Sequence, residues 1–369
     1  MSVKKMNIDK SLGWCRMKKP QILGNYTANR KNNFNLLRML AAIGVLISHA
    51  YPISLGLGAE EPLTRFIGMS LGSLSVLIFF SISGFFITKS FVFSVSWQRF
   101  LLARALRLFP ALFVVLTVTI VLGGVFLTTA DPVEFWSSAP GYLLRNLTLF
   151  KPDYSLPGVF EANPYGTAIN GSLWTLFYEV VCYTGIFIAG LLGILHRPRL
   201  FAFCLGLVVV LCLLMPYLPV HSRLNSLSRL ALPFAIGSGF FLLRDLIPLS
   251  TLVVAILGLM AWGLYSTEAF RPILVLALSY GVFVIGYWPS AFLQGYNHLG
   301  DYSYGTYIYA FPVQQLVANW GITDPLTNIA IALPVTLVCA VLSWHFVELV
   351  ALNLKTRSFV FSARQAHDQ

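Results

Sequence analysis

Long apolar runs recur along the whole chain and restrict its fold more than any other feature. A helix needs about 20 apolar residues to cross the hydrocarbon core of a bilayer. Only 11% of the residues are charged, whereas soluble domains average about 25%. The sequence therefore predicts an all-α polytopic integral membrane protein with ten transmembrane helices. The predicted spans cover residues 34–54, 66–88, 107–127, 172–192, 200–218, 229–243, 248–266, 272–288, 300–319 and 327–350.

The distribution of basic residues predicts the orientation. Cytoplasmic loops of membrane proteins carry an excess of Lys and Arg. With the N-terminus in the cytoplasm, only six of the 25 Lys and Arg lie on the outer side: Arg65, Arg145, Lys151, Arg223, Arg229 and Arg271. We therefore expect both termini to lie inside, with a long outer loop at 128–171. This pattern predicts three parts of the chain: a basic cytoplasmic tail (1–33), a transmembrane domain (34–354) and a C-terminal cytoplasmic tail (355–369).

The first apolar run contains two costly side chains, Arg38 and His49. Eleven residues of helix turn by about 1,100°, so both side chains lie within about 20° of one face and roughly 16 Å apart. In the predicted orientation Arg38 lies near the inner surface and His49 in the outer half of the membrane. Ionisable residues inside membrane spans are usually functional. The alternatives are an interfacial anchor for Arg38 and a histidine satisfied near the outer interface for His49.

A second pair of basic residues, Arg104 and Arg107, lies in the stretch QRFLLARALR at 98–107. The two arginines are one helical turn apart and hence on one face. Planar guanidinium groups suit phosphate oxygens, so the pair could hold a phosphorylated cofactor at the cytoplasmic side. Ordinary flanking charge of a membrane span is an equal alternative.

A carboxylate also falls within an apolar run, in the stretch NGSLWTLFYEVVCY at 170–183. Glu179 is expected roughly 10–14 Å below the outer surface, at a depth similar to that of His49. A carboxylate that meets an imidazole could orient it as a general base. A structural ion pair between Glu179 and a Lys or Arg is the alternative.

Two other acidic residues receive structural interpretations. Asp301 precedes an apolar helix and is predicted to be its N-cap. Glu348 ends the last span and is expected to reach interfacial water. The six histidines are scattered along the chain, so no metal site is predicted.

Taken together, these motifs resemble acyltransferase family 3, the integral-membrane O-acyltransferases that modify bacterial surface and exported saccharides. The resemblance runs from about residue 34 to residue 354. It rests on the Arg38–His49 spacing, the Arg104–Arg107 pair and three blocks of sequence: FFSISGFFI at 79–87, GVFEANPYGTAINGSLWTLFYEV at 158–180 and LGDYSYGTYIY at 299–309.

The chain departs from the family pattern at two places. Many members carry a histidine where this chain has Ala310, so no role of that histidine can be transferred. The last helix of the family usually ends in Glu-x-Pro, whereas Leu349 and Val350 follow Glu348 here. This second departure leaves the role of Glu348 open.

The resemblance implies an acyl-CoA donor, most simply acetyl-CoA, on the cytoplasmic side of the bacterial inner membrane. Arg38, Arg104 and Arg107 are then expected to bind the phosphates of the donor. An extended pantetheine arm is about as long as the separation of roughly 16 Å between Arg38 and His49. The spacing on the first helix could therefore match the length of the donor. A longer acyl group, such as succinyl, stays open.

The resemblance also implies a carbohydrate acceptor, often lipid-linked, at the outer face. His49 is expected to act as the general base on the acceptor hydroxyl, with a covalent acyl-His step as the alternative. Glu179 is expected to orient His49 or to contact the acceptor. Asn170, Trp174 and Tyr178 are further residues expected to contact the substrate.

The competing class of function is a transporter or flippase that moves a lipid-linked saccharide or an acyl group without making a bond. The one-faced Arg–His spacing and the lack of repeats with interrupted helices favour an enzyme. The net charge of +11 reflects orientation, and no nucleic-acid partner is expected because no basic cluster carries a binding module. The oligomeric state is open, and a homo-oligomer is compatible with the sequence.

Overall fold

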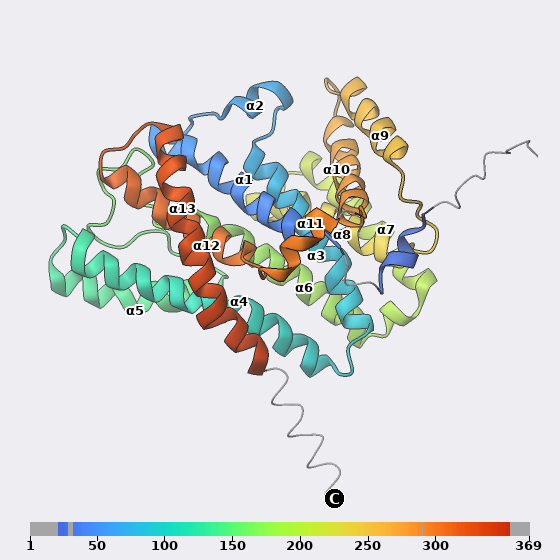
Figure 1. Ribbon diagram of the computed structural model, residues 1–369, viewed down its shortest axis with the longest axis horizontal. Coiled ribbons are helices and arrows are strands. Elements are labelled where there is room, and N and C mark those ends of the chain that lie inside the picture. Colours follow the sequence, from blue (N-terminus) through green and yellow to red (C-terminus); the bar gives the residue numbers. More distant parts are fainter. Residues whose placement is uncertain (1–20, 29–31, 290, 355–369) are drawn as a thin grey trace, which may run out of the picture.

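The computed structural model describes residues 21–28, 32–289 and 291–354. Within these ranges the chain forms α-helices and shorter helical turns, which are joined by loops (Figure 1). The predicted C-terminal tail and most of the predicted N-terminal tail lie outside the described residues. The helices are α1 (Phe34–Leu55), α2 (Pro62–Ile67), α3 (Leu71–Val92), α4 (Trp97–Leu122), α5 (Pro132–Thr148), α6 (Trp174–Leu191), α7 (Pro198–Leu214), α8 (Ser222–Leu242), α9 (Thr251–Gly263), α10 (Phe270–Gly286), α11 (Ala291–Gly295), α12 (Ser303–Asn319) and α13 (Pro325–Ser343). Two π-helical extensions, Gly123–Leu127 and Trp344–Glu348, continue α4 and α13.

Six helical segments are long and apolar enough to cross a membrane, and they confirm a polytopic, all-helical protein. They are Phe34–Leu55, Leu71–Val92, Trp97–Leu127, Gly171–Leu191, Pro198–Tyr217 and Pro325–Leu354. The other four predicted spans coincide with α8, α9, α10 and α12. The 13 residues of α9 rise only about 20 Å, which is shorter than a hydrocarbon core of about 30 Å.

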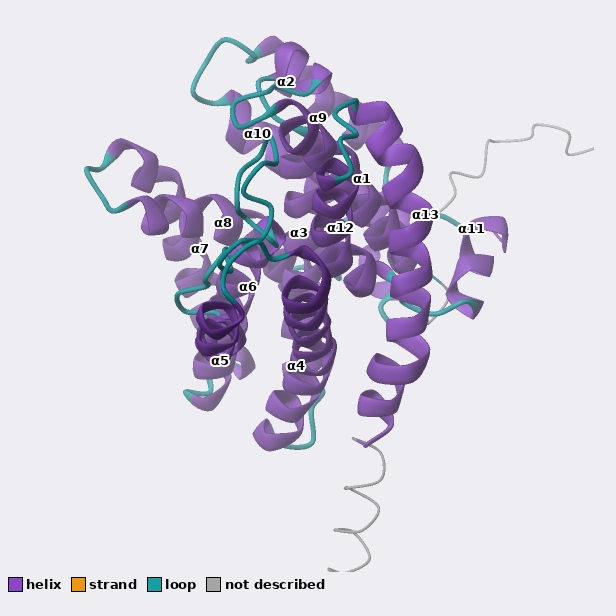
Figure 2. Ribbon diagram, turned by 90° about the vertical axis from the view of Figure 1, so that its left-hand side faces the viewer, coloured by secondary structure: helices purple, strands orange, loops and turns teal. Residues whose placement is uncertain are grey.

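The helices α1, α3 and α12 lie at the centre of the molecule, with α13 on one side and α7 and α8 on the other (Figures 1 and 2). Small residues allow α3 and α8 to approach closely. A Cβ atom at Gly84 would lie 1.9 Å from the carbonyl oxygen of Phe234, and one at Gly237 would lie 2.1 Å from that of Ser81. In the same contact the Ser238 hydroxyl donates to the Gly84 carbonyl at 3.2 Å. Close approach of this kind is typical of helix pairs in membranes.

The segment predicted as a long outer loop contains the helix α5, which was not predicted from the sequence. Asp131 caps α5 by accepting the backbone N–H of Val133 at 2.8 Å. Phe135, Ala139, Tyr142 and Asn146 are buried at helical spacing on one face. The helix lies beside the end of α4 (Figure 1). Sequence inspection missed α5 because Pro140 and Gly141 interrupt an otherwise amphipathic pattern.

Candidate active site

Three cavities adjoin one another and together contain most of the predicted site residues. The first, here called the His49 cavity, has a volume of about 790 Å³. The second, the Glu179 cavity, has about 280 Å³. The third, the Lys89 cavity, has about 630 Å³. The His49 and Glu179 cavities share Val76 and Tyr307, and the Glu179 and Lys89 cavities share Arg38 and Arg104.

The Lys89 cavity is strongly basic. Among the described residues its lining carries four cationic side chains and no acidic one: Arg38, Lys89, Arg99 and Arg104. The Arg38 guanidinium and the Lys89 ammonium lie 5.6 and 5.9 Å from the centre of the Phe86 ring. The Lys89 ammonium also donates to the backbone carbonyl of Thr27. A concave surface of this charge is suited to phosphate groups.

Arg104 lies where the Lys89 and Glu179 cavities meet. Its Nε is buried and has no hydrogen-bond partner among the residues that the structure describes. Leaving a buried charged donor unpaired is costly. An anionic ligand in these cavities would remove that cost, so the site fits the phosphates of an acyl-CoA donor.

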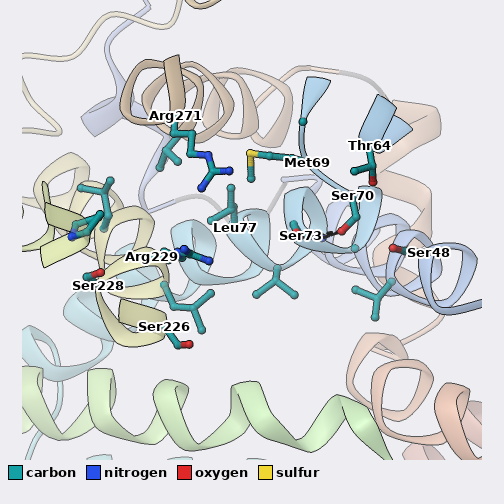
Figure 3. A pocket seen from close by; sticks show the side chains of 18 of the residues that line it. Ser48, Thr64, Met69, Ser70, Ser73, Leu77, Ser226, Ser228, Arg229 and Arg271 are labelled. Atoms are coloured by element: carbon teal, nitrogen blue, oxygen red, sulfur yellow. Dashed lines mark hydrogen bonds between the residues drawn. The ribbon is translucent and has the colours of Figure 1, made fainter. Parts of the chain in front are cut away.

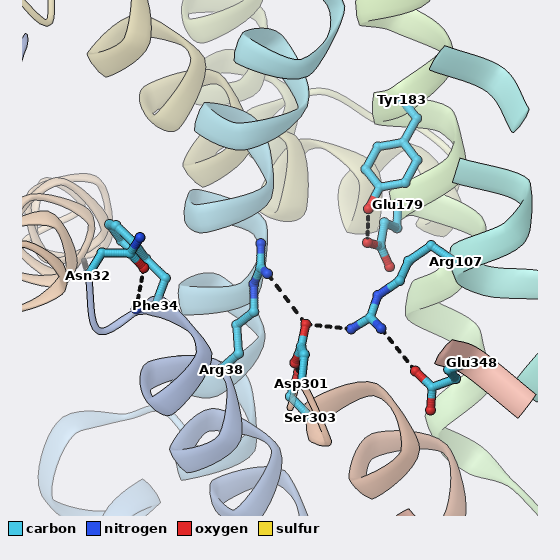
Figure 4. Close-up of polar contacts among 9 residues, drawn as sticks. All are labelled: Asn32, Phe34, Arg38, Arg107, Glu179, Tyr183, Asp301, Ser303 and Glu348. Atoms are coloured by element: carbon cyan, nitrogen blue, oxygen red, sulfur yellow. Dashed lines mark hydrogen bonds and ion pairs between the residues drawn. The ribbon is translucent and has the colours of Figure 1, made fainter. Parts of the chain in front are cut away.

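Arg107, by contrast, is already paired within the protein (Figure 4). Its guanidinium contacts Asp301 at 2.6 Å and Glu348 at 2.9 Å. Arg38 lies 3.7 Å from the same Asp301 carboxylate. Burying a guanidinium is favourable only when counter-charges and hydrogen bonds compensate its lost hydration. The two members of the predicted phosphate-binding pair therefore differ, and the role of Arg107 toward a donor stays a prediction.

The structure corrects the interpretations of Asp301 and Glu348. No side-chain capping bond is present at Tyr302, the N-cap of α12, and Asp301 accepts the Ser303 hydroxyl at 2.5 Å and bridges Arg38 and Arg107. Glu348 does not reach interfacial water, because its side chain is only 1% exposed. It is held by Arg107 and by the Ser343 hydroxyl at 3.1 Å.

The predicted meeting of Glu179 and His49 does not occur in the structure. Glu179 accepts a hydrogen bond from the Tyr183 hydroxyl and lines the same cavity as Arg38, Arg104 and Arg107 (Figure 4). This arrangement is favourable because neighbouring cations stabilise a buried carboxylate. Glu179 is therefore associated with the arginines rather than with the imidazole.

His49 lines the largest of the three cavities. Its ring packs edge to face on Phe311, with the ring centres 5.2 Å apart. Its Nδ1 is buried and has no hydrogen-bond partner within the described part of the chain. The imidazole is therefore positioned by packing.

The residues predicted to contact the substrate fall into two groups. Trp174 lines the His49 cavity. Asn170 instead donates to the Ile308 carbonyl at 2.9 Å and accepts the Ser172 N–H at 3.2 Å, while Tyr178 is buried in the core. Asn170 therefore joins α6 to α12. Ala310, which replaces the histidine of many family members, is fully buried in α12.

Several cavity residues were not anticipated from the sequence. Tyr307 lines both the His49 and Glu179 cavities, and its hydroxyl lies 2.5 Å from the Thr175 hydroxyl. Arg229 and Arg271 extend into the His49 cavity (Figure 3). The sequence predicts an outer position for both, whereas helix packing places them in the same cavity as His49. No group of three or more potential metal ligands occurs among the described residues.

Comparisons with known proteins identify the family of the chain. The family model described as an acyltransferase domain (acyltransferase family 3) matches residues 31–345. An O-acetyl transferase of Shigella phage Sf6 is 30% identical over 332 residues, which is 87% of this chain and 96% of the relative. Nodulation protein 10 of Rhizobium leguminosarum bv. viciae is 34% identical over 163 residues, 43% of this chain and 44% of the relative. No solved structure matches the chain. The protein is therefore a member of acyltransferase family 3.

Proposed function

We propose that this acyltransferase transfers an acetyl group from cytoplasmic acetyl-CoA to a hydroxyl of a saccharide at the outer face of the bacterial inner membrane. The main observation that supports this proposal is the series of three adjoining cavities, which leads from the basic Lys89 cavity past Arg104 to His49. Similarity to a phage protein named O-acetyl transferase supports acetyl as the acyl group. The excess of basic residues on one side supports the proposed orientation.

Donor binding is assigned to the Lys89 cavity and the arginines beside it. Lys89, Arg99 and Arg104 would face the phosphates of the donor. Arg38 begins the interval of roughly 16 Å along α1 that ends at His49. A donor with its phosphates at this level could place its thioester beside the imidazole. Replacement of Arg38 with alanine should then raise the apparent KM for acetyl-CoA, and an unchanged KM would contradict this assignment.

His49 is the proposed general base. The acceptor hydroxyl oxygen forms a bond to the acyl carbon while its proton passes to the imidazole. The bond between the acyl carbon and the thioester sulfur breaks, and the imidazolium returns the proton to the departing thiolate. The products are an O-acetylated saccharide and free CoA. A covalent acyl-His49 would be detected by mass spectrometry of protein quenched during turnover.

The test is transfer of radiolabelled acetyl from acetyl-CoA into the polysaccharide fraction of membranes. We expect His49→Ala to lower the rate by about 10²–10⁴-fold, the usual contribution of general-base catalysis. His196→Ala is the matched control, because His196 is exposed and lines none of the three cavities. Undiminished transfer by His49→Ala at equal abundance would place the base elsewhere.

A transporter or flippase is the competing function, and acetyl-CoA consumption separates the two. Purified protein that acts as an acetyltransferase should release free CoA when an acceptor is present. A flippase that makes no bond should release none. Absence of CoA release together with movement of a labelled lipid-linked saccharide would favour the flippase.

A further inference from the structure

Two arginines of the His49 cavity have no role in the mechanism described so far. Arg229 belongs to α8 and Arg271 to the first turn of α10. Figure 3 shows both side chains extending into the cavity from their separate helices. Each of them lines the same cavity as His49.

Neither arginine is neutralised by the protein. Among the described residues, no ion pair or hydrogen bond involves the guanidinium of Arg229 or Arg271. The lining of the same cavity also contains three carboxylates, but none of them forms an ion pair with either arginine among the described residues. Glu61 accepts the backbone N–H of Leu71, Glu268 accepts the Tyr217 hydroxyl at 3.4 Å, and Glu60 is exposed. The two guanidinium groups therefore remain available to a ligand.

Two of the other basic side chains predicted to lie on the outer side have partners, whereas Arg65 and Lys151 are exposed and line none of the three cavities. Arg145 pairs with Asp153 at 2.8 Å. Arg223 lies over the Phe150 ring at 5.8 Å and donates to the Phe150 carbonyl at 3.5 Å. Arginines on the outer side do not serve the orientation signal that places basic residues in the cytoplasm. Two unpaired arginines that converge on one cavity thus indicate recognition of an anion.

The remainder of the lining suits a saccharide. Ser48, Ser70, Ser73 and Ser226 line the cavity, and Trp174 supplies an aromatic surface. Pockets that combine a few directed polar groups with aromatic side chains are typical of small-molecule sites. The same cavity therefore contains side chains suited to a saccharide and two arginines suited to an anion.

We propose that Arg229 and Arg271 bind an oxyanion carried by the acceptor, so that the acceptor is an anionic saccharide. The oxyanion can be the diphosphate of a lipid-linked sugar or the carboxylate of an acidic sugar, because guanidinium groups bind both in the same way. This inference rests on the proposed transfer to a saccharide. It adds the charge of the acceptor and the two residues that select it.

The test is the thermal unfolding midpoint of the purified full-length protein in detergent, measured against increasing probe concentration. The probes are farnesyl diphosphate, methyl β-D-glucuronide, neutral methyl β-D-glucoside and phosphatidylglycerol. A ligand that binds the folded state raises the midpoint. We expect one of the first two probes to raise it and the glucoside to have no effect. The effective anionic probe identifies whether the oxyanion belongs to the lipid carrier or to the sugar.

Variants connect the effect to the two arginines. Arg229→Ala and Arg271→Ala should each raise the half-effective probe concentration about tenfold, the usual effect of losing a charge-assisted hydrogen bond. Arg65→Ala is the matched control, because Arg65 is exposed near the cavity but does not line it. An unchanged response to acetyl-CoA shows that each variant is folded. The corresponding lysine substitutions, which keep the charge, should give a smaller loss.

The inference is overturned if neither anionic probe raises the midpoint or if the two alanine variants respond like the unmodified protein. An equal response to phosphatidylglycerol would also overturn it, because the site would then be an ordinary lipid contact. Acetyl-CoA consumption by the same preparations tests the proposed function separately. If the unmodified protein consumes no acetyl-CoA but still responds to the probe through the two arginines, acetyl transfer is contradicted and the anion site is supported.

Discussion

At the scale of single residues, the two arginines one turn apart on α4 have different surroundings. Arg107 holds two carboxylates, whereas the Nε of Arg104 has no hydrogen-bond partner among the described residues. Arg104→Ala should therefore raise the apparent KM for acetyl-CoA about tenfold or more, as expected for the loss of a charged hydrogen bond. Steady-state CoA release at varied acetyl-CoA measures this change, and an unchanged KM would contradict donor binding by Arg104.

Arg107→Ala should act on stability instead. Removing one partner of a buried ionic group costs about 3–5 kcal/mol because it leaves the other charges uncompensated. Asp301 and Glu348 would lose their closest cation. We expect a lower unfolding midpoint and less folded protein in size-exclusion profiles. A normal midpoint combined with a raised KM would show that Arg107 serves the donor after all.

Glu179 is the residue whose expected role changes most. Because it lies with the arginines and not with His49, Glu179→Gln should alter donor binding more than the chemical step. Removing its negative charge leaves Arg38 and Arg104 more attractive to phosphate, so the KM for acetyl-CoA should fall. The measurement is the separate change in KM and kcat. A large loss of kcat at constant KM would restore a catalytic role for Glu179.

At the scale of helices, the backbones of α3 and α8 lie so close together that larger side chains do not fit at their contact. A Cβ at Gly84 meets the Phe234 carbonyl, so Gly84→Ala should lower stability by about 1–3 kcal/mol, the usual cost of overpacking. Gly206→Ala on α7 is the control, because nothing lies within 4 Å of its added Cβ. Unfolding midpoints in detergent compare the two. Equal midpoints would mean that α3 and α8 can separate at little cost.

At the scale of the whole molecule, the orientation in the membrane decides which cavity opens toward the donor side and which toward the acceptor side. Gln98 at the start of α4 and Ser137 on α5 are both exposed and lie at opposite ends of the helical hairpin. In a background without native cysteines, an impermeant maleimide should label Ser137→Cys in spheroplasts. It should label Gln98→Cys only after permeabilisation. The reverse pattern would invert the proposed sides of donor and acceptor.

Much of the architecture follows from local sequence patterns. The apolar runs predict where helices occur because each must satisfy its backbone polar groups within the bilayer. The six long apolar helices all overlap predicted spans. The 3.6-residue period also suffices to relate Arg38 to His49, since both belong to α1. The helix α5 was not predicted because Pro140 and Gly141 interrupt its amphipathic pattern.

The sequence by itself determined the helical membrane fold, the acyltransferase motifs and the register of the first helix, because each depends on residues close together in the chain. Only the tertiary structure decided the partners of the buried charges. Arg107 contacts residues 194 and 241 positions away, and such contacts depend on how the helices rotate and pack. The same packing turned Glu179 toward the arginines and brought Arg229 and Arg271 to the cavity of His49. Hydrophobic periodicity specifies which residues form helices, but it leaves the long-range pairing of polar side chains undetermined.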